Sequence, residues 1–177
     1  HDPVLVSALQ VRDVGLPMRY GAQVQGWFHD PEGERLVELA RDAPGTIVEL
    51  GTQWGKSISY ILHDTDKDVV CVDWWQDDSE FQMFTDLLQE NHWESRVEMV
   101  RQSTQDAAKS WTRPIGLLHI DAGHDYENVL ADYTLWSPHI VPGGAIAFHD
   151  REMAGPARVL RDLVLPDPRW LDRRVVM

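Results

Sequence analysis

The chain has 177 residues, which fits one domain with a full-sized hydrophobic core. Its formal net charge is −13, from 29 acidic and 16 basic residues, and so negative a surface repels the phosphates of nucleic acids and anionic membranes. Nucleic acid is therefore not an expected partner, and no apolar run reaches the roughly eighteen residues that a membrane span needs.

Two further features bear on the compartment. No charged-then-apolar leader opens the chain, so no secretory signal is expected in it. The one cysteine, Cys71, lies in the apolar run "VVCVD" and has no second cysteine for an internal disulfide. These features predict a protein of the reducing cytoplasm.

The first predicted helix follows an N-terminal cover segment, residues 1–29. Asp30 can cap this helix and Pro31 suits its first turn. An apolar stripe from Leu36 to Ala40 then stops before Gly45, where the helix is expected to end.

Strands and helices alternate from there to the end of the chain. Five short apolar strands are predicted at residues 46–50, 68–73, 96–102, 115–121 and within 142–150. Helices are predicted at residues 56–64, 78–92, 104–111, 126–140 and 155–164, and a last strand within 169–177. Strands that are apolar on both faces and alternate with helices indicate a mostly parallel central sheet with helices on both faces.

Four of the predicted strands end in polar residues, namely Glu49, Asp73, Asp121 and the pair His149-Asp150. Ligands of such α/β sheets bind beyond the carboxyl ends of the strands. This shared ending is the main functional signal in the sequence.

The first strand runs into a glycine loop, "VELGTQWGKS". Gly51 and Gly55 allow backbone N–H groups to approach a ligand closely. The loop nearly matches the phosphate-binding pattern G-x-x-x-x-G-K-[ST], but leucine stands at position 50, where the first glycine is required. The dinucleotide pattern G-x-G-x-x-G is not matched either, so a nucleotide hydrolase is the weakest of the functions considered.

The pattern E-x-G-x-x-x-G, with an acid at the end of the second strand, resembles the class I S-adenosylmethionine-dependent methyltransferases. The resemblance implies a Rossmann-like domain with these cofactor-binding residues: Glu49, Gly51, Thr52, Gly55, Ser57, Asp73, Trp74, Gln102, Ser103 and Asp121. Its loop would approach the methionine part of the cofactor. A carboxylate at Asp73 can accept hydrogen bonds from both ribose hydroxyls.

Three of these assignments concern the adenine. Trp74 would lie against its ring, although packing in the core is an equally ordinary role for a tryptophan. Gln102 and Ser103, at the end of the third strand, stand where the family contacts the adenine edge.

The second half of the chain, "HIDAGHDYENVLADYTLWSPHIVPGGAIAFHD", is similar to one branch of that family. This branch contains the metal-dependent small-molecule O-methyltransferases and cephalosporin-hydroxylase-like proteins. The resemblance implies a divalent metal held by Asp121, His149 and Asp150. His149 stands where an acid is commoner, which favours manganese or iron over magnesium. The alternative is that no metal binds and the histidines act as bases.

His124 is the best candidate for a catalytic base, acting beside Asp121. An unperturbed imidazole titrates near pH ~6.5 and can take a proton from a hydroxyl. The alternative for His124 is a loop histidine bonded to the backbone. For His119, inside the strand, packing in the core is the better interpretation.

The sequence therefore predicts a single domain over residues 1–177, with its core at 30–177 and a shortened C-terminal hairpin. The family that the sequence resembles usually closes its sheet with an antiparallel hairpin, and residues 169–177 are enough for one strand. Either the given chain is trimmed, or the sheet is short or completed by a partner, as in a homo-oligomer. The expected activity is transfer of a methyl group from S-adenosylmethionine to a hydroxyl of a small molecule. The main alternative is a non-catalytic or differently reactive domain that binds the same cofactor.

Overall fold

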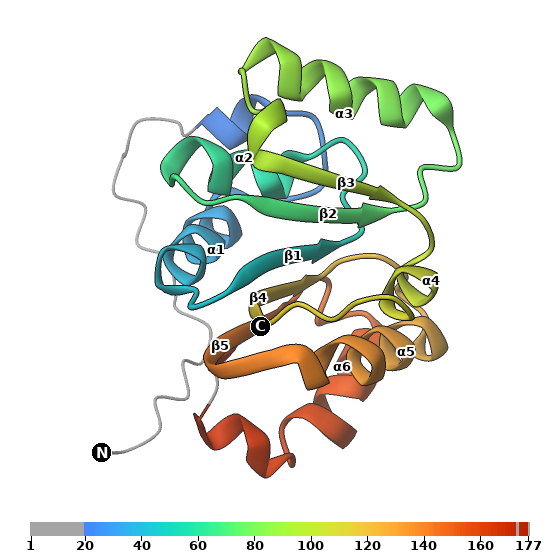
Figure 1. Cartoon of the computed structure of the whole chain (residues 1–177). Helices are drawn as coiled ribbons and strands as arrows, with labels where there is room; N and C mark the ends of the chain where they lie inside the picture. The colour runs from blue at the N-terminus through green and yellow to red at the C-terminus, as the bar shows by residue number, and fades with distance from the viewer. Residues whose placement is uncertain (1–19, 173, 177) are drawn as a thin grey trace.

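A computed structural model describes residues 20–172 and 174–176, and one sheet of six strands forms its centre (Figure 1). The strands lie in the order β3-β2-β1-β4-β5-β6, and each neighbouring pair is parallel. They are β1 (Thr46–Leu50), β2 (Val69–Asp73), β3 (Val97–Arg101), β4 (Ile115–Ile120), β5 (Ile140–Phe148) and β6 (Arg174–Val176). The predicted α/β fold is confirmed.

Helices cover both faces of this sheet. They are α1 (Asp30–Asp42), α2 (Lys56–Asp64), α3 (Asp78–Glu90), α4 (Thr104–Ala108), α5 (Tyr126–Trp136) and α6 (Ala154–Val159). Two separate clusters of buried side chains follow, one beneath α1, α2 and α3 and the other beneath α4, α5 and α6. The fold therefore has three layers with the sheet in the middle.

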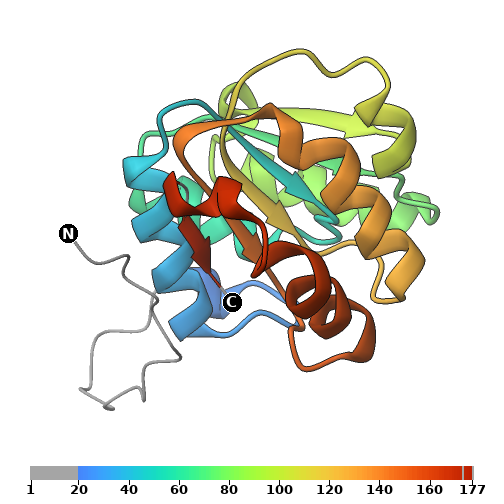
Figure 2. The same cartoon turned by 90° about the horizontal axis from the view of Figure 1, so that it is seen from below.

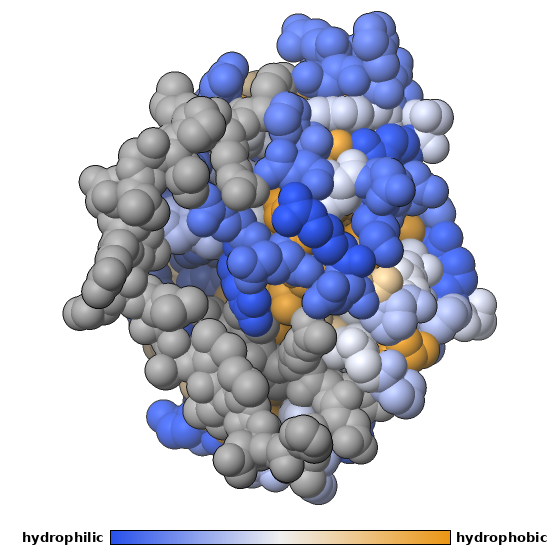
Figure 3. All heavy atoms as spheres, turned by 90° about the vertical axis from the view of Figure 1, so that its left-hand side faces the viewer, coloured by the Kyte–Doolittle hydropathy of each residue, from blue (hydrophilic) through white to orange (hydrophobic). Residues whose placement is uncertain are grey.

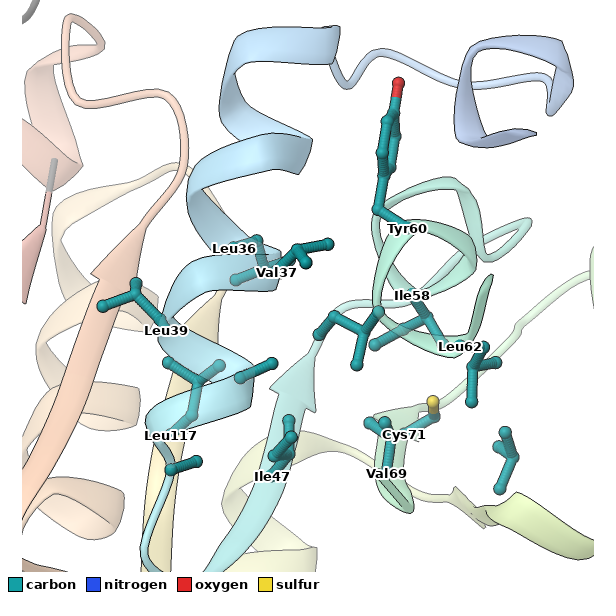
Figure 4. Close-up of a cluster of buried hydrophobic side chains, with 14 of the residues drawn as sticks. Leu36, Val37, Leu39, Ile47, Ile58, Tyr60, Leu62, Val69, Cys71 and Leu117 are labelled. Atoms are coloured by element: carbon teal, nitrogen blue, oxygen red, sulfur yellow. The ribbon is translucent and has the colours of Figure 1, made fainter. Parts of the chain in front are cut away.

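The packing in the first cluster explains why the α1 segment folds as a helix against the sheet (Figure 4). Leu36, Val37 and Leu39 lie on one side of α1 and meet strand residues such as Ile47 and Leu117. Apolar residues spaced three and four apart place one stripe of the helix on the sheet. Each such side chain contributes about 1.5–3 kcal/mol when it is fully buried.

The start of α1 differs from the prediction in its cap. His29, not Asp30, is the N-cap, and the Glu32 side chain accepts a hydrogen bond from the His29 backbone N–H at 2.8 Å. Asp30 is the first helical residue, and its carboxylate accepts a hydrogen bond from the Tyr60 hydroxyl on α2. Because Glu32 accepts the hydrogen bond of the His29 backbone N–H, the capping box forms at His29. The helix therefore begins one residue earlier than an Asp30 cap requires.

The C-terminal part runs along the side of β5 that faces away from β4 (Figure 2). A π-helical turn at Leu160–Val164 follows α6, and β6 then pairs with β5 in parallel. The predicted last strand is present, and the residues described contain one parallel strand where the family's usual ending is an antiparallel hairpin. In the N-terminal cover segment, residues 1–19 lie outside the described residues, and Phe28 packs into the first core cluster.

The chain order brings the functional signals together at one side of the sheet. Strands β1, β2 and β3 are laid down outward from the centre, and the chain then returns to place β4 on the other side of β1. The carboxyl ends of β1 and β4 therefore flank the point where the strand order reverses, which is where ligands of such sheets bind.

Figure 3 shows the side of the molecule that lies opposite these carboxyl ends. Among the residues that are not grey, its surface is mainly hydrophilic. Within residues 20–172 and 174–176, none of the helices combines the length and the apolar composition required to cross a bilayer.

Candidate active site

A cleft of about 810 Å³ opens at the carboxyl ends of the strands. Of the residues predicted to form the site, ten line it: Gly51, Thr52, Ser57, Asp73, Trp74, Ser103, Asp121, His124, His149 and Asp150. Glu49, Gly55 and Gln102 do not line it. The cleft is large enough for a cofactor together with a small second ligand.

The glycine loop after β1 is fixed by the carboxylate at the end of β2. Asp73 Oδ2 accepts hydrogen bonds from the backbone N–H groups of Thr52 and Gln53, both at 2.9 Å. Its other oxygen, Oδ1, accepts one from Trp75 N at 3.0 Å. Three backbone donors thus orient the carboxylate and leave one acceptor site free, on Oδ1.

Both loop glycines are required by the protein's own chain. Gly51 has φ +85°, and a Cβ there would lie 2.3 Å from the carbonyl oxygen of Asp121 at the end of β4. Gly55 has φ +83° and caps α2, and a Cβ there would lie 2.6 Å from the Phe84 ring. Gly51 therefore lets the loop pass against the backbone that follows β4, whereas its close approach to a ligand stays a prediction.

Glu49 lies beneath this loop and is fully buried. The Ser57 hydroxyl donates to Glu49 Oε1 at 2.5 Å, and His119 Nδ1 lies 2.9 Å from the same oxygen. His119 is only 3% exposed, so it is a core residue as predicted, with a polar partner that the sequence did not indicate. This network ties β1 to α2 and β4 from inside.

The loop also leaves a polar atom without a partner beside the cleft. The indole N–H of Trp54 is buried and has no hydrogen-bond partner among the described residues. Buried donors are normally satisfied, so this N–H in the cleft wall fits a bound polar ligand.

A second wall of the cleft comes from the start of α4 and from α5. Ser103 caps α4 by accepting a hydrogen bond from Asp106 N at 3.1 Å, and Thr104 and Gln105 continue the wall. Gln102, one residue before the cap, is exposed. Sequence reasoning therefore missed Thr104 and Gln105, although a serine cap indicates that the next residues turn away from the strand.

Asp132 of α5 is an unpredicted buried acid in this wall. It is fully buried, and its Oδ1 accepts a hydrogen bond from the Thr104 hydroxyl at 2.5 Å. Its Oδ2 has no partner among the described residues. Burial raises the pKa of Asp132 to about 6, against the opposing effect of the Thr104 hydrogen bond.

The ends of β4 and β5 hold a cluster of two histidines and two carboxylates. His149 Nδ1 lies 3.0 Å from Asp121 Oδ1 and 3.0 Å from Asp150 Oδ2. His124 Nε2 lies 3.0 Å from the same oxygen of Asp150. Asp150 has φ +51°, an uncommon conformation for a residue other than glycine.

The carboxylates of this cluster raise the pKa of His149. Burial by itself lowers its pKa, but hydrogen bonding and charge from Asp121, Glu32 and Asp150 outweigh burial and raise the pKa to about 11. The ring stacks on Phe28 with centroids 5.1 Å apart. Its Nδ1 lies at ion-pair distance from both carboxylates.

Candidate metal ligands also lie here. Asp121, His124 and Asp150 each offer one atom, and these three atoms lie within 4.8 Å of one another. The sequence-based set had His149 in place of His124. The structure brings all four residues together, and His149 contacts both carboxylates from the buried side.

Comparison with known proteins gives the family. A family described as "Methyltransferase domain" matches residues 48–151, more than half of the chain. The uncharacterized protein y4gI of Sinorhizobium fredii is 30% identical over an alignment of 138 residues, which covers 71% of this chain and 15% of that protein. The chain thus spans about 15% of the length of this curated relative.

Solved structures of low identity share the fold. The O-methyltransferase from Bacillus cereus in complex with SAH has a TM-score of 0.66 and 18% identity, covering 89% of this chain and 84% of that chain. CalS11, a TDP-rhamnose 3'-O-methyltransferase of calicheamicin biosynthesis, has a TM-score of 0.60 and 17% identity, covering 75% and 68%. The chain belongs to the methyltransferase domain family, and its fold is that of the class I enzymes that use S-adenosylmethionine.

Proposed function

We propose that the chain transfers the methyl group of S-adenosylmethionine to a hydroxyl oxygen of a small molecule. One observation carries the proposal. A single cleft holds an oriented carboxylate, Asp73, beside the glycine loop, and a cluster of proton-accepting groups at the ends of β4 and β5. Donor and acceptor can therefore be bound side by side and aligned.

The residues at the loop side fit the cofactor. Asp73 would accept a hydrogen bond from the ribose diol, and Trp74, 58% exposed, would cover the adenine. Thr52, Ser57 and the indole N–H of Trp54 would contact the polar methionine end. When bound, the cofactor supplies a methyl carbon already activated on a sulfonium, so the protein has only to orient the acceptor and remove its proton.

His124 is the proposed base. Because its Nε2 lies 3.0 Å from Asp150 Oδ2, the neutral ring would carry its proton on Nε2 and donate it to this carboxylate. Nδ1 is then the atom that accepts the proton of the acceptor hydroxyl. Asp150 would stabilise the imidazolium that forms, as a carboxylate does for other catalytic histidines.

A divalent metal is the alternative source of activation. Asp121, His124 and Asp150 would hold it, or His149 would replace His124 as in the sequence-based set. The mixed oxygen and nitrogen donors suit manganese or iron better than magnesium. A metal there would lower the pKa of the acceptor hydroxyl as a Lewis acid does.

One experiment tests methyl transfer and separates base from metal. The protein is stripped with a chelator and incubated with S-adenosylmethionine and hydroxylated acceptors, and mass spectrometry detects the methylated product with and without each metal added back. Activity that survives stripping but is lost in His124→Ala supports the base. Activity that returns only with manganese or iron supports the metal, and bound cofactor with no product from any acceptor contradicts the proposed enzyme.

A further inference from the structure

The charge of the cleft restricts the acceptor. Five acidic side chains line it: Asp73, Glu80, Asp121, Asp132 and Asp150. Among the described residues, Lys56 is the one lysine or arginine in the lining, and its Nζ donates to the carbonyl oxygen of Gly26 at 3.3 Å. The positive charge of Lys56 is thus held at the main chain of the segment before α1.

The histidines do not reverse this balance at the acceptor end. His149 faces Asp121 and Asp150 on one ring nitrogen, and its Nε2 lies 3.6 Å from Glu32 Oε2. His124 shares Asp150 with it. Even with both imidazoles protonated, three carboxylates face two positive rings, so without a metal the side chains of this cluster supply no net positive charge to attract a phosphate.

Exposed apolar side chains stand at the same end. Trp27 is 79% exposed and Met153 is 42% exposed, and both line the cleft. Trp27 precedes Phe28, which stacks on His149, and Met153 N donates to the carbonyl oxygen of Asp150 at 2.8 Å. Exposed aromatic and thioether groups at a cleft mouth commonly contact the apolar face of a ligand.

Resting on the proposed function, we propose that the acceptor is an uncharged ring compound that bears a hydroxyl group. The ring would lie against Trp27 and Met153, with its hydroxyl directed to His124. The same ring carried on a phosphate or a nucleoside diphosphate would be disfavoured, because its negative charge would enter a cleft lined by carboxylates.

The test uses two matched pairs of acceptors with the whole chain and S-adenosylmethionine. One pair is 3,4-dihydroxybenzyl alcohol and its phosphate ester, and the other is methyl rhamnoside and rhamnose carried on thymidine diphosphate. We expect kcat/KM for an uncharged member to exceed that of its charged partner by about tenfold or more at low salt. The pair that responds also distinguishes an aryl acceptor from a sugar.

Salt separates charge from size. Exposed charges are screened over about 8–10 Å at physiological ionic strength. Raising the salt from about 20 to about 300 mM should therefore increase kcat/KM for the charged member and leave the uncharged member unchanged. A difference that salt does not alter would arise from the bulk of the phosphate and would overturn the electrostatic argument.

Two charge reversals provide a matched comparison. Glu152 is exposed in the turn between Asp150 and Met153, whereas Glu90 is exposed at the end of α3. Glu152→Lys should raise kcat/KM for the charged acceptor, and Glu90→Lys, with the same change in net charge, should not. Equal effects of the two variants would contradict a local field.

The experiment distinguishes a wrong acceptor class from a wrong proposed function. Cofactor binding is measured separately by calorimetry. If the cofactor binds and the phosphorylated acceptors are methylated as well as or better than the uncharged ones, the acceptor class is wrong and the methyltransferase stands. If no uncharged acceptor is methylated, the acceptor class is also overturned. If the chain does not bind the cofactor at all, the proposed function itself is wrong.

Discussion

Asp73 shows how one residue can be both a structural and a binding group. Its carboxylate holds the glycine loop through Thr52, Gln53 and Trp75, and it also faces the cleft. The sequence pattern predicted the second role because an acid ends β2, but it could not indicate the first. The conformation of the loop that supplies the three N–H donors becomes visible only in the folded chain.

Replacing Asp73 should weaken the cofactor complex strongly. Loss of a charge-assisted hydrogen bond to the cofactor costs about 1.5–3 kcal/mol, and the loop loses its anchor as well, so Asp73→Ala should raise the Kd for S-adenosylmethionine at least about tenfold. Asp68 is exposed directly before the first residue of β2 and provides the control. Calorimetry that finds equal Kd values for Asp73→Ala and Asp68→Ala would remove Asp73 from the site.

Replacing His124 should slow the chemical step without weakening cofactor binding. General-base catalysis contributes about 10²–10⁴ in rate, so His124→Ala should lower kcat by that order while the Kd for S-adenosylmethionine stays unchanged. His63, exposed on α2, is the control, and His63→Ala should retain full activity. A fall in cofactor affinity without a fall in kcat would place His124 on the cofactor instead.

At the scale of elements, the junction of β1 and β4 explains why glycine is required at position 51. The sequence predicted a close approach of the loop to a ligand, but the contact that excludes a side chain at this position is with the backbone of Asp121 and Ala122. Gly51→Ala should therefore lower the melting temperature and abolish cofactor binding together. Gly143 also has a positive φ, +79°, but a Cβ added there would have no atom within 4 Å. Gly143→Ala should therefore lower the free energy of unfolding only by the cost of a positive φ at alanine, about 1 kcal/mol. Equal losses in thermal unfolding would contradict the proposed clash.

The contact between α4 and α5 provides a prediction on pH. The folded pKa of Asp132 is raised to about 6 from an ordinary value of 3.8, so the folded state binds the proton more tightly than the unfolded state does. The contribution of Asp132 to stability is therefore full below pH ~4 and is lost as the pH rises toward ~6, by up to about 3 kcal/mol.

Asp132→Asn isolates this effect because an amide oxygen can still accept from the Thr104 hydroxyl. Denaturant unfolding from pH 4 to 7 should show the variant gaining stability relative to the unaltered chain as the pH rises. A constant difference between the two proteins over this range would show that Asp132 titrates normally.

Over the whole molecule, the fold follows from patterns that are local in sequence. Runs such as "TIVEL" and "VVCVD" are buried on both faces, and their alternation with amphipathic helices indicates a parallel sheet. The order of the strands then places Asp121 beside His149, as predicted. The parallel pairing of β6 could not be predicted, because three residues carry no pattern that sets their direction.

The site was predictable only as far as its residues end strands. Asp73, Asp121 and Asp150 follow this rule, whereas Trp27, Thr104 and Met153 reach the cleft from loops and helix starts. Glu49 ends no strand: it lies one residue before the end of β1 and is buried against Ser57 and His119. Side chains alternate along a strand, so a shift of one residue decides between the core and the cleft.

The central claim is that this cleft binds S-adenosylmethionine, and calorimetric titration with S-adenosylmethionine and ATP side by side tests it most directly. The loop lacks the first glycine of a phosphate-binding loop, and Asp73 suits a ribose diol better than a triphosphate. We expect a one-to-one complex with S-adenosylmethionine and far weaker binding of ATP. Tighter binding of ATP than of S-adenosylmethionine would contradict the account and favour a nucleotide-hydrolysing enzyme.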